Sequence, residues 1–276
     1  MASSGRVVVG VDGSESSLAA AAWAAGEADL RHAEHVHLVM VSGDPSRDDE
    51  AWEIVGPVAE RTADRHPGLT VSPGVEPGEP ADVLLQLSDG AELVVVGSRG
   101  RSTLAATLLG SVSAKVAAHA RCPVVVVRDH RDSGAVVVGV DNSPHSGATL
   151  RYAFDAASRY GSELVAVQVW QDIEYAPVVP RLEYELADLR DEALRGVAEQ
   201  LAGWTESYPD VPVRKVAQRG HPVAELAAAA EDARLLVVGH RGRGGFTGLL
   251  LGSVAAGVLH HASCPVAVVR AGGEAS

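Results

Sequence analysis

The sequence predicts an α/β protein made of two tandem, doubly wound domains, each with a five-stranded parallel sheet. Three observations predict this fold class. The chain has 276 residues, which suits two ordinary domains better than one. Hydrophobic residues make up 46% of the chain and charged residues 21%, as in globular proteins that bury a core. Finally, an internal repeat indicates that the two domains are copies of one unit.

The repeat consists of two matched blocks. The run VVVGVD at residues 7–12 recurs letter for letter at 136–141, and the block 93–124 recurs in similar form at 235–266. The two blocks start 86 residues apart in the first copy and 99 residues apart in the second, so the second copy carries 13 extra residues. We therefore predict one domain over 1–130 and a second over 131–276.

Each copy alternates short β-branched runs with Ala-rich segments, which is typical of βαβ units. Because the runs are apolar on consecutive residues, they fit strands that are buried on both faces. Ser14 and Ser143 follow the aspartates and are favourable helix N-caps, and Pro144 suits a first helical turn. We expect strands at 7–11, 36–41, 70–75, 93–96, 124–127 and 213–217, and helices at 14–31, 110–120 and 182–202.

Charge and composition exclude several classes of function. Lysine and arginine number 23 and acidic residues 36, for a net charge of -13. The chain therefore lacks the basic field that nucleic acids require, and no nucleic-acid partner is expected. No signal peptide or membrane-spanning run is predicted, so we expect a cytoplasmic protein with no membrane partner. Cys122 and Cys264 are too few for a disulfide framework or a zinc site, and we expect both to be buried.

The most informative spacing follows the fourth strand of each copy. The pattern G-x2-G-x9-G-S occupies residues 97–111 and again 239–253. Glycines at a strand exit allow positive φ and close backbone approach, so that successive amides can surround an anion. The Gly-Ser pair then opens a helix, whose free N–H groups and dipole favour phosphate. The predicted phosphate-binding residues are Gly97, Gly100, Gly110 and Ser111 in the first copy, and Gly239, Gly242, Gly252 and Ser253 in the second.

The aspartates that follow the first strands are expected to meet these loops. In a doubly wound sheet, ligands bind at the carboxyl ends of the strands where the strand order reverses. If the first and fourth strands are neighbours, Asp12 and Asp141 each face a glycine loop, as suits a nucleotide with ribose hydroxyls or a bound metal. Arg99 and Arg241 either pair with phosphate oxygens or face solvent. No metal site made by protein side chains is predicted.

These residues closely resemble the universal stress protein family in its tandem form, from residue 6 to residue 270. The glycine signature is intact in both copies, and the closing segments HARCPV at 119–124 and HASCPV at 261–266 support the resemblance. The resemblance implies a Rossmann-like fold, similar to the adenine nucleotide alpha hydrolases, that binds ATP. Mg2+ is expected to accompany the nucleotide.

The resemblance also implies roles for individual segments. Asp12 and Asp141 would lie near the adenosine, and backbone groups around Met40 and Val169 would meet adenine. The last strands, 124–127 and 266–269, would join the two copies into a pseudo-dimer. The second copy has Gly244-Gly245 where the first has Ser102-Thr103, so the two sites are predicted to be inequivalent.

The expected function is that of an ATP-binding regulatory stress protein, whose nucleotide occupancy shifts conformation or assembly, including a homodimer of the tandem chain. Two alternatives stay open. One is a slow Mg-dependent ATP hydrolase or phosphotransfer enzyme that uses Asp12 or Asp141. The other is an interaction module whose glycine loops are only structural. The chain has no Walker lysine and no kinase-type catalytic set, so the sequence favours binding over turnover.

Overall fold

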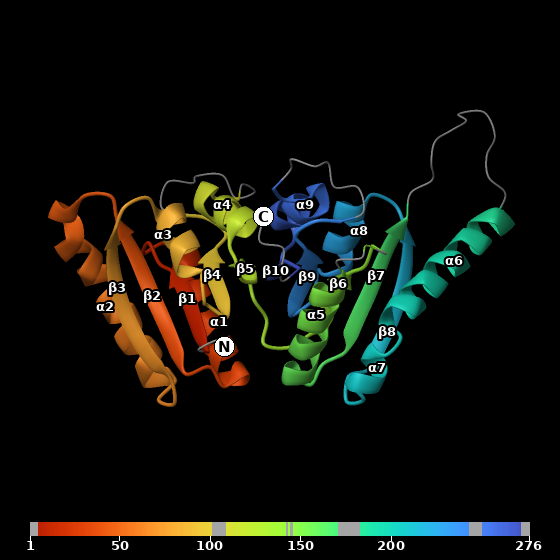
Figure 1. Cartoon of the computed structure of the whole chain (residues 1–276), viewed down its shortest axis with the longest axis horizontal. Helices are drawn as coiled ribbons and strands as arrows, with labels where there is room; N and C mark the ends of the chain where they lie inside the picture. The colour runs from red at the N-terminus through yellow and green to blue at the C-terminus, as the bar shows by residue number, and fades with distance from the viewer. Residues whose placement is uncertain are drawn as a thin grey trace. The chain divides into compact units, whose positions relative to one another are not determined.

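The computed structural model describes residues 5–100, 109–141, 143, 146–170, 183–242 and 250–271, without the side chains of 183–186. The chain forms two compact units (Figure 1). The first contains Met1–His130 and Cys264–Arg270, and the second contains Arg131–Ser263 and Ala271–Ser276. Both units are α/β, as the sequence predicted.

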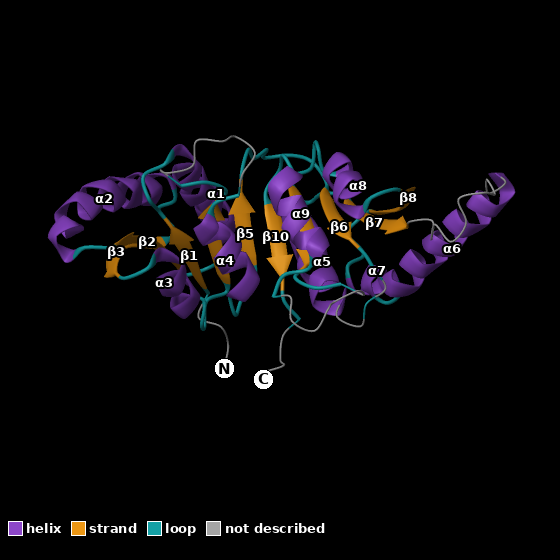
Figure 2. Ribbon diagram, turned by 90° about the horizontal axis from the view of Figure 1, so that it is seen from above, coloured by secondary structure: helices purple, strands orange, loops and turns teal. Residues whose placement is uncertain are grey.

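The first unit is a doubly wound sheet. Its parallel strands have the order β3-β2-β1-β4-β5. Figure 2 shows α1 and α2 on one face of this sheet and α3 and α4 on the other. The elements are β1 (Arg6–Gly10), α1 (Glu15–Arg31), β2 (His35–Ser42), the 3-10 helix η1 (Pro45–Arg47), α2 (Asp48–Arg65), β3 (Thr70–Pro77), α3 (Pro80–Leu87), β4 (Leu93–Gly97), α4 (Ser111–His119) and β5 (Val124–Val127).

The second unit repeats this plan with parallel strands in the order β9-β6-β7-β8. Its elements are β6 (Val136–Gly139), α5 (Ser146–Tyr160), β7 (Leu164–Trp170), α6 (Glu183–Leu201), α7 (Trp204–Ser207), β8 (Val213–Arg219), α8 (Pro222–Ala229), β9 (Leu235–Gly239) and α9 (Ser253–His261). The fifth strand of the second repeat, β10 (Val266–Val269), pairs antiparallel with β5 and is part of the first unit.

The core is built mainly from valine, alanine and leucine, so the fold needs few aromatic residues. Every residue of β4 and β5 is buried, because helices cover both faces of the sheet. Against these valines α1 packs a face of small side chains, which lets the helix approach the sheet closely. The fully buried residues of α1 include Ala20, Ala24, Ala25 and Ala28.

Local signals placed the element ends to within a few residues. Ser14 caps α1, as predicted, and its side chain accepts the N–H of Ser17. The predicted strand 70–75 extends to Pro77 and includes Pro73, which β3 tolerates because it is the edge strand. Pro144 and most of the 13-residue insertion lie outside the described residues.

The cysteines are buried, as predicted. Burial raises the pKa of the Cys122 thiol to about 12, so this thiol is unreactive at neutral pH. Among the described helices, none is both long and apolar enough to cross a membrane.

Candidate functional site

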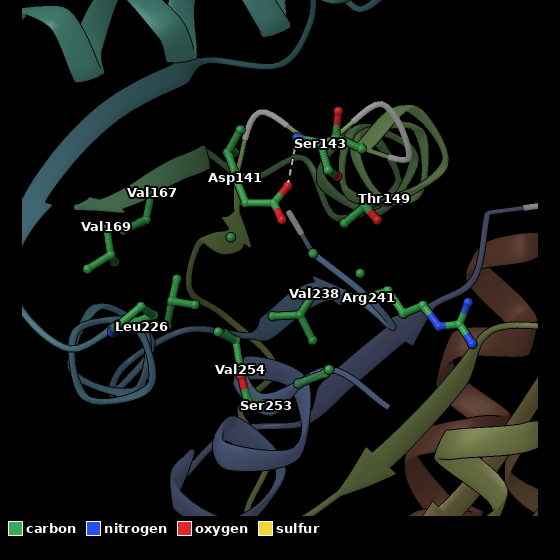
Figure 3. Close-up of a pocket in the computed structure, with 18 of the residues that line it drawn as sticks. Asp141, Ser143, Thr149, Val167, Val169, Leu226, Val238, Arg241, Ser253 and Val254 are labelled. Carbon is green, nitrogen blue, oxygen red and sulfur yellow. Dashed lines mark hydrogen bonds between the residues drawn. The ribbon is translucent and has the colours of Figure 1, made fainter. Parts of the chain in front are cut away.

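A cavity of about 410 Å³ opens in the second unit at the carboxyl ends of β6 and β9 (Figure 3). The starts of α5 and α9 form further walls. All seven residues that the sequence predicted as site residues in this repeat line the cavity, and they come from four separate segments. They are Asp141, Val169, Gly239, Arg241, Gly242, Gly252 and Ser253.

The aspartates are held by the turns that follow the first strand of each repeat. Oδ1 of Asp141 accepts the backbone N–H of Ser143 at 3.0 Å (Figure 3). In the first unit, Oδ1 of Asp12 accepts the N–H of Ser14 at 3.0 Å and its hydroxyl at 2.6 Å. Such short-range bonds are typical of Asp at the start of a helix. They fix one oxygen of each carboxylate and direct the other toward the glycine loop.

The glycine loops lie against these carboxylates, as the sequence predicted from the strand order. β1 pairs with β4 and β6 pairs with β9. A Cβ built on Gly100 would lie 2.8 Å from Oδ2 of Asp12, and one on Gly242 would collide with Oδ2 of Asp141. A side chain at either position would therefore have to displace the carboxylate oxygen, so glycine permits this close approach of backbone to carboxylate.

The other expected reason for these glycines, a positive φ, is wrong. None of the six signature glycines has φ in the left-handed region. Crowding again accounts for Gly97, where a Cβ would lie 2.7 Å from the backbone carbonyl carbon of Ser16. Side chains are excluded here by neighbouring atoms and not by backbone conformation.

The helices that follow the glycine loops begin with backbone N–H groups that have no partner within the helix. The N–H of Gly110 donates to the carbonyl of Ser98 at 2.8 Å, and the N–H of Gly252 donates to the carbonyl of His240 at 2.7 Å. These two amides are therefore already bonded within the loop. Gly110 and Gly252 are the N-caps of α4 and α9, and neither helix has a side-chain cap. The N–H groups that follow, beginning at Ser111 and Ser253, are the ones that can meet an anion.

Apolar side chains form the opposite wall of the cavity. Val167 and Val169 come from β7, Leu226 from α8 and Val238 from β9 (Figure 3). The sequence did not predict Val167, Leu226 or Val238 as site residues, because no motif marks them. Leu226 reaches the site only because α8 packs against the sheet. The wall suits a flat apolar ring system.

Three of the residues that the sequence predicted for the sites are Arg241, Arg99 and Met40. Arg241 lines the cavity, and in Figure 3 its guanidinium points away from it. Arg99 is exposed, and its carbonyl accepts a long hydrogen bond of 3.4 Å from the Ser14 hydroxyl. Met40 is half-buried in β2. The loop residues 102–103 and 244–245, on which the inequivalence of the two sites was predicted, lie outside the described residues.

The described residues that line the cavity include one carboxylate, Asp141, and no histidine. In the part of the chain that the structure describes, no group of three or more His, Cys, Asp or Glu residues could hold a metal ion.

Comparison with known proteins agrees with the repeat. The model of the universal stress protein family matches residues 4–128 and again 134–270. Universal stress proteins of Mycobacterium tuberculosis and Mycolicibacterium smegmatis are each 40% identical to the chain, and each alignment covers 96% of both proteins. The crystal structure of a universal stress protein from Archaeoglobus fulgidus has the same fold, with a TM-score of 0.72 at 23% identity, over 98% of this chain and 99% of that one. The sequence resemblance is thus confirmed, and the chain belongs to the universal stress protein family.

Proposed function

We propose that the second unit binds an adenine nucleotide, specifically ATP, in the 410 Å³ cavity. The observation that carries this proposal is that the seven residues predicted from the sequence, which come from four segments, line one cavity. The volume lies in the range of about 300–1,000 Å³ that is usual for small-molecule sites. An apolar wall with a few convergent polar groups is also the usual composition of such sites.

The two ends of the cavity suit the two ends of a nucleotide. The adenine would pack against Val167, Val169 and Leu226. The phosphates would lie at the loop 239–242 and at the uncapped start of α9, where N–H groups and the helix dipole favour negative charge. Binding through local dipoles suits a chain whose net charge is -13, because no basic field is needed.

Mg2+ would arrive with the phosphates, because the described residues build no metal cluster of their own. Asp141 is the one carboxylate among the described residues that line the cavity, and it would meet either this cation or a ribose hydroxyl. By the same reasoning Asp12 and the loop 97–100 would form the site of the first unit. Occupancy of these sites would regulate the conformation of the tandem chain, or its assembly as a pseudo-dimer or homodimer, if one state binds ATP more tightly.

The test uses the full chain, purified gently. Mass spectrometry of released small molecules should find adenine nucleotide, and calorimetric titration of nucleotide-free protein with ATP and Mg2+ should give one or two equivalents per chain. The same samples assayed for phosphate release separate binding from hydrolysis. A chain that carries no nucleotide and shows no ATP-dependent thermal shift would rule out the proposal.

A further inference from the structure

A row of hydroxyl groups runs along the start of α5 into the cavity. Ser146 and Thr149 are three residues apart in α5, a spacing that places side chains on one helix face, and Ser143 precedes the helix. All three residues line the cavity. Ser143 and Thr149 are buried, with 7% and 4% of their surface exposed. No described residue makes a hydrogen bond with any of these three hydroxyls. We call them the α5 hydroxyl row.

The first unit uses the equivalent positions differently. The hydroxyl of Ser14 donates to Oδ1 of Asp12 at 2.6 Å, and the hydroxyl of Ser17 donates to the carbonyl of Ser14 at 2.9 Å. The third position is Ala20, which is fully buried and has no hydroxyl. Two hydroxyls therefore stabilise the turn after β1, and none corresponds to Thr149.

Thr149 lies beside the glycine loop. Its Oγ1 is 3.2 Å from the place that a Cβ on Gly239 would occupy, so the hydroxyl faces the point where the loop leaves β9. Figure 3 shows Thr149 on the same side of the cavity as Asp141 and Ser143. Because this hydroxyl lines the cavity and no described residue bonds it, it can donate to a bound ligand.

We propose that the α5 hydroxyl row binds phosphoryl oxygens of the nucleotide, with Thr149 as the principal donor, and that it makes the second site the tighter of the two. This inference rests on the proposed function. Hydroxyl donors suit phosphate because each can donate to an anionic oxygen without adding charge to the protein. The row thus distinguishes phosphorylated nucleosides from the bare nucleoside, and it distinguishes the second site from the first.

The experiment titrates the full chain with ATP and, separately, with adenosine. Thr149→Val replaces the hydroxyl with a methyl group of similar size. We expect it to weaken ATP binding at the tighter site about tenfold, as for the loss of one hydrogen bond to a charged group, and to leave adenosine binding unchanged. Thr149→Ser keeps the hydroxyl and should keep the ATP affinity.

The matched control is Thr62→Val in α2. Thr62 is also buried, but its hydroxyl donates to the carbonyl of Val58 at 2.7 Å in its own helix. This variant should leave ATP binding unchanged. Thermal unfolding verifies that each variant folds. Should Thr149→Val fail to fold, Ser146→Ala provides the test at a half-buried position, and we expect it to weaken ATP binding but not adenosine binding.

The outcomes separate the two proposals. If the wild-type chain does not bind ATP, the proposed function fails and this inference fails with it. If the wild-type chain binds ATP and Thr149→Val binds it equally well, the hydroxyl row is not a phosphate site, while the proposed function stands. Equal losses of ATP and adenosine affinity would also overturn the inference, because the hydroxyl would then act on the shape of the cavity.

Discussion

At the scale of single residues, the candidate site depends on glycines, whose lack of a Cβ leaves room for a neighbouring carboxylate. Gly100 and Gly242 have no side chain because a carboxylate oxygen of Asp12 or Asp141 lies where a Cβ would be. The glycine signature was expected to allow both positive φ and close backbone approach, and only the close approach is found. This distinction matters for mutagenesis, because even alanine should disturb the site.

Gly242→Ala is predicted to displace the Asp141 carboxylate and to weaken ATP binding at the second site by at least about tenfold. Titration of the full chain with ATP measures the effect. Gly26→Ala is the control, because nothing lies within 4 Å of a Cβ at this position in α1. This control should raise the free energy of unfolding by about 0.5–1 kcal/mol without changing ATP affinity. Unchanged binding in Gly242→Ala would contradict the close approach as a requirement of the site.

At the scale of secondary-structure elements, three polar side chains, those of His35, His37 and Ser72, link β2 and β3. Nε2 of His35 lies 2.6 Å from the hydroxyl of Ser72, and Nδ1 of His37 lies 2.9 Å from the same oxygen. Burial lowers the pKa of His37, and the nearby His35 and Arg6 lower it further, while Ser72 and Glu76 oppose this shift. The folded state therefore disfavours the charged form of His37.

This lowered pKa predicts a stability that depends on pH. Below the ordinary value of 6.5, the unfolded chain binds a proton at His37 that the folded chain resists, so the free energy of unfolding falls as the pH decreases. We expect His37→Gln to reduce this dependence, measured by urea denaturation at about pH 7.5 and about pH 5.5. The exposed His130→Gln should retain the wild-type dependence. An unchanged slope in His37→Gln would contradict the assignment.

At the scale of the whole molecule, a segment from the end of the chain completes the sheet of the first unit. Val266, Ala267 and Val268 of β10 pair antiparallel with Val126, Val125 and Val124 of β5. A guanidinium nitrogen of Arg270 then donates to the carbonyl of Ala118 at the end of α4, at 2.6 Å. β10 thereby covers an edge of β5 that would otherwise be open to aggregation.

Val268→Pro is predicted to weaken this pairing, because proline has no N–H and a ring that fits poorly within a ladder. Amide hydrogen exchange in the peptide containing β5 should accelerate about tenfold or more. Ala271→Pro, just beyond the strand, should leave the exchange unchanged. If β5 stays equally protected in both variants, the stability of the first unit does not depend on β10.

Local patterns predicted much of the fold and of the site. The β-branched runs and Ala-rich segments predicted the doubly wound fold class, and Asp12 and Asp141 were expected to meet the glycine loops on the condition that the first and fourth strands are neighbours. The structure meets this condition, because β1 pairs with β4 and β6 pairs with β9. The local patterns were not sufficient for Leu226 or Thr149. Neither residue belongs to a motif, and each reaches the cavity only because a helix packs on a particular face of the sheet.

The sequence by itself determined the family, the duplication and the glycine loops, because these depend on residue identity and on spacing along the chain. Only the tertiary structure decided that β10 belongs with the first unit and that crowding explains the glycines. Only the structure, too, decided that the hydroxyls of Ser14 and Ser17 are bonded within the turn after β1, while no described residue bonds the hydroxyls of Ser143 and Ser146. Strand pairing, crowding and the availability of a donor all depend on contacts between distant segments. Two nearly identical motifs can therefore predict the same site twice, while their surroundings make the two copies different.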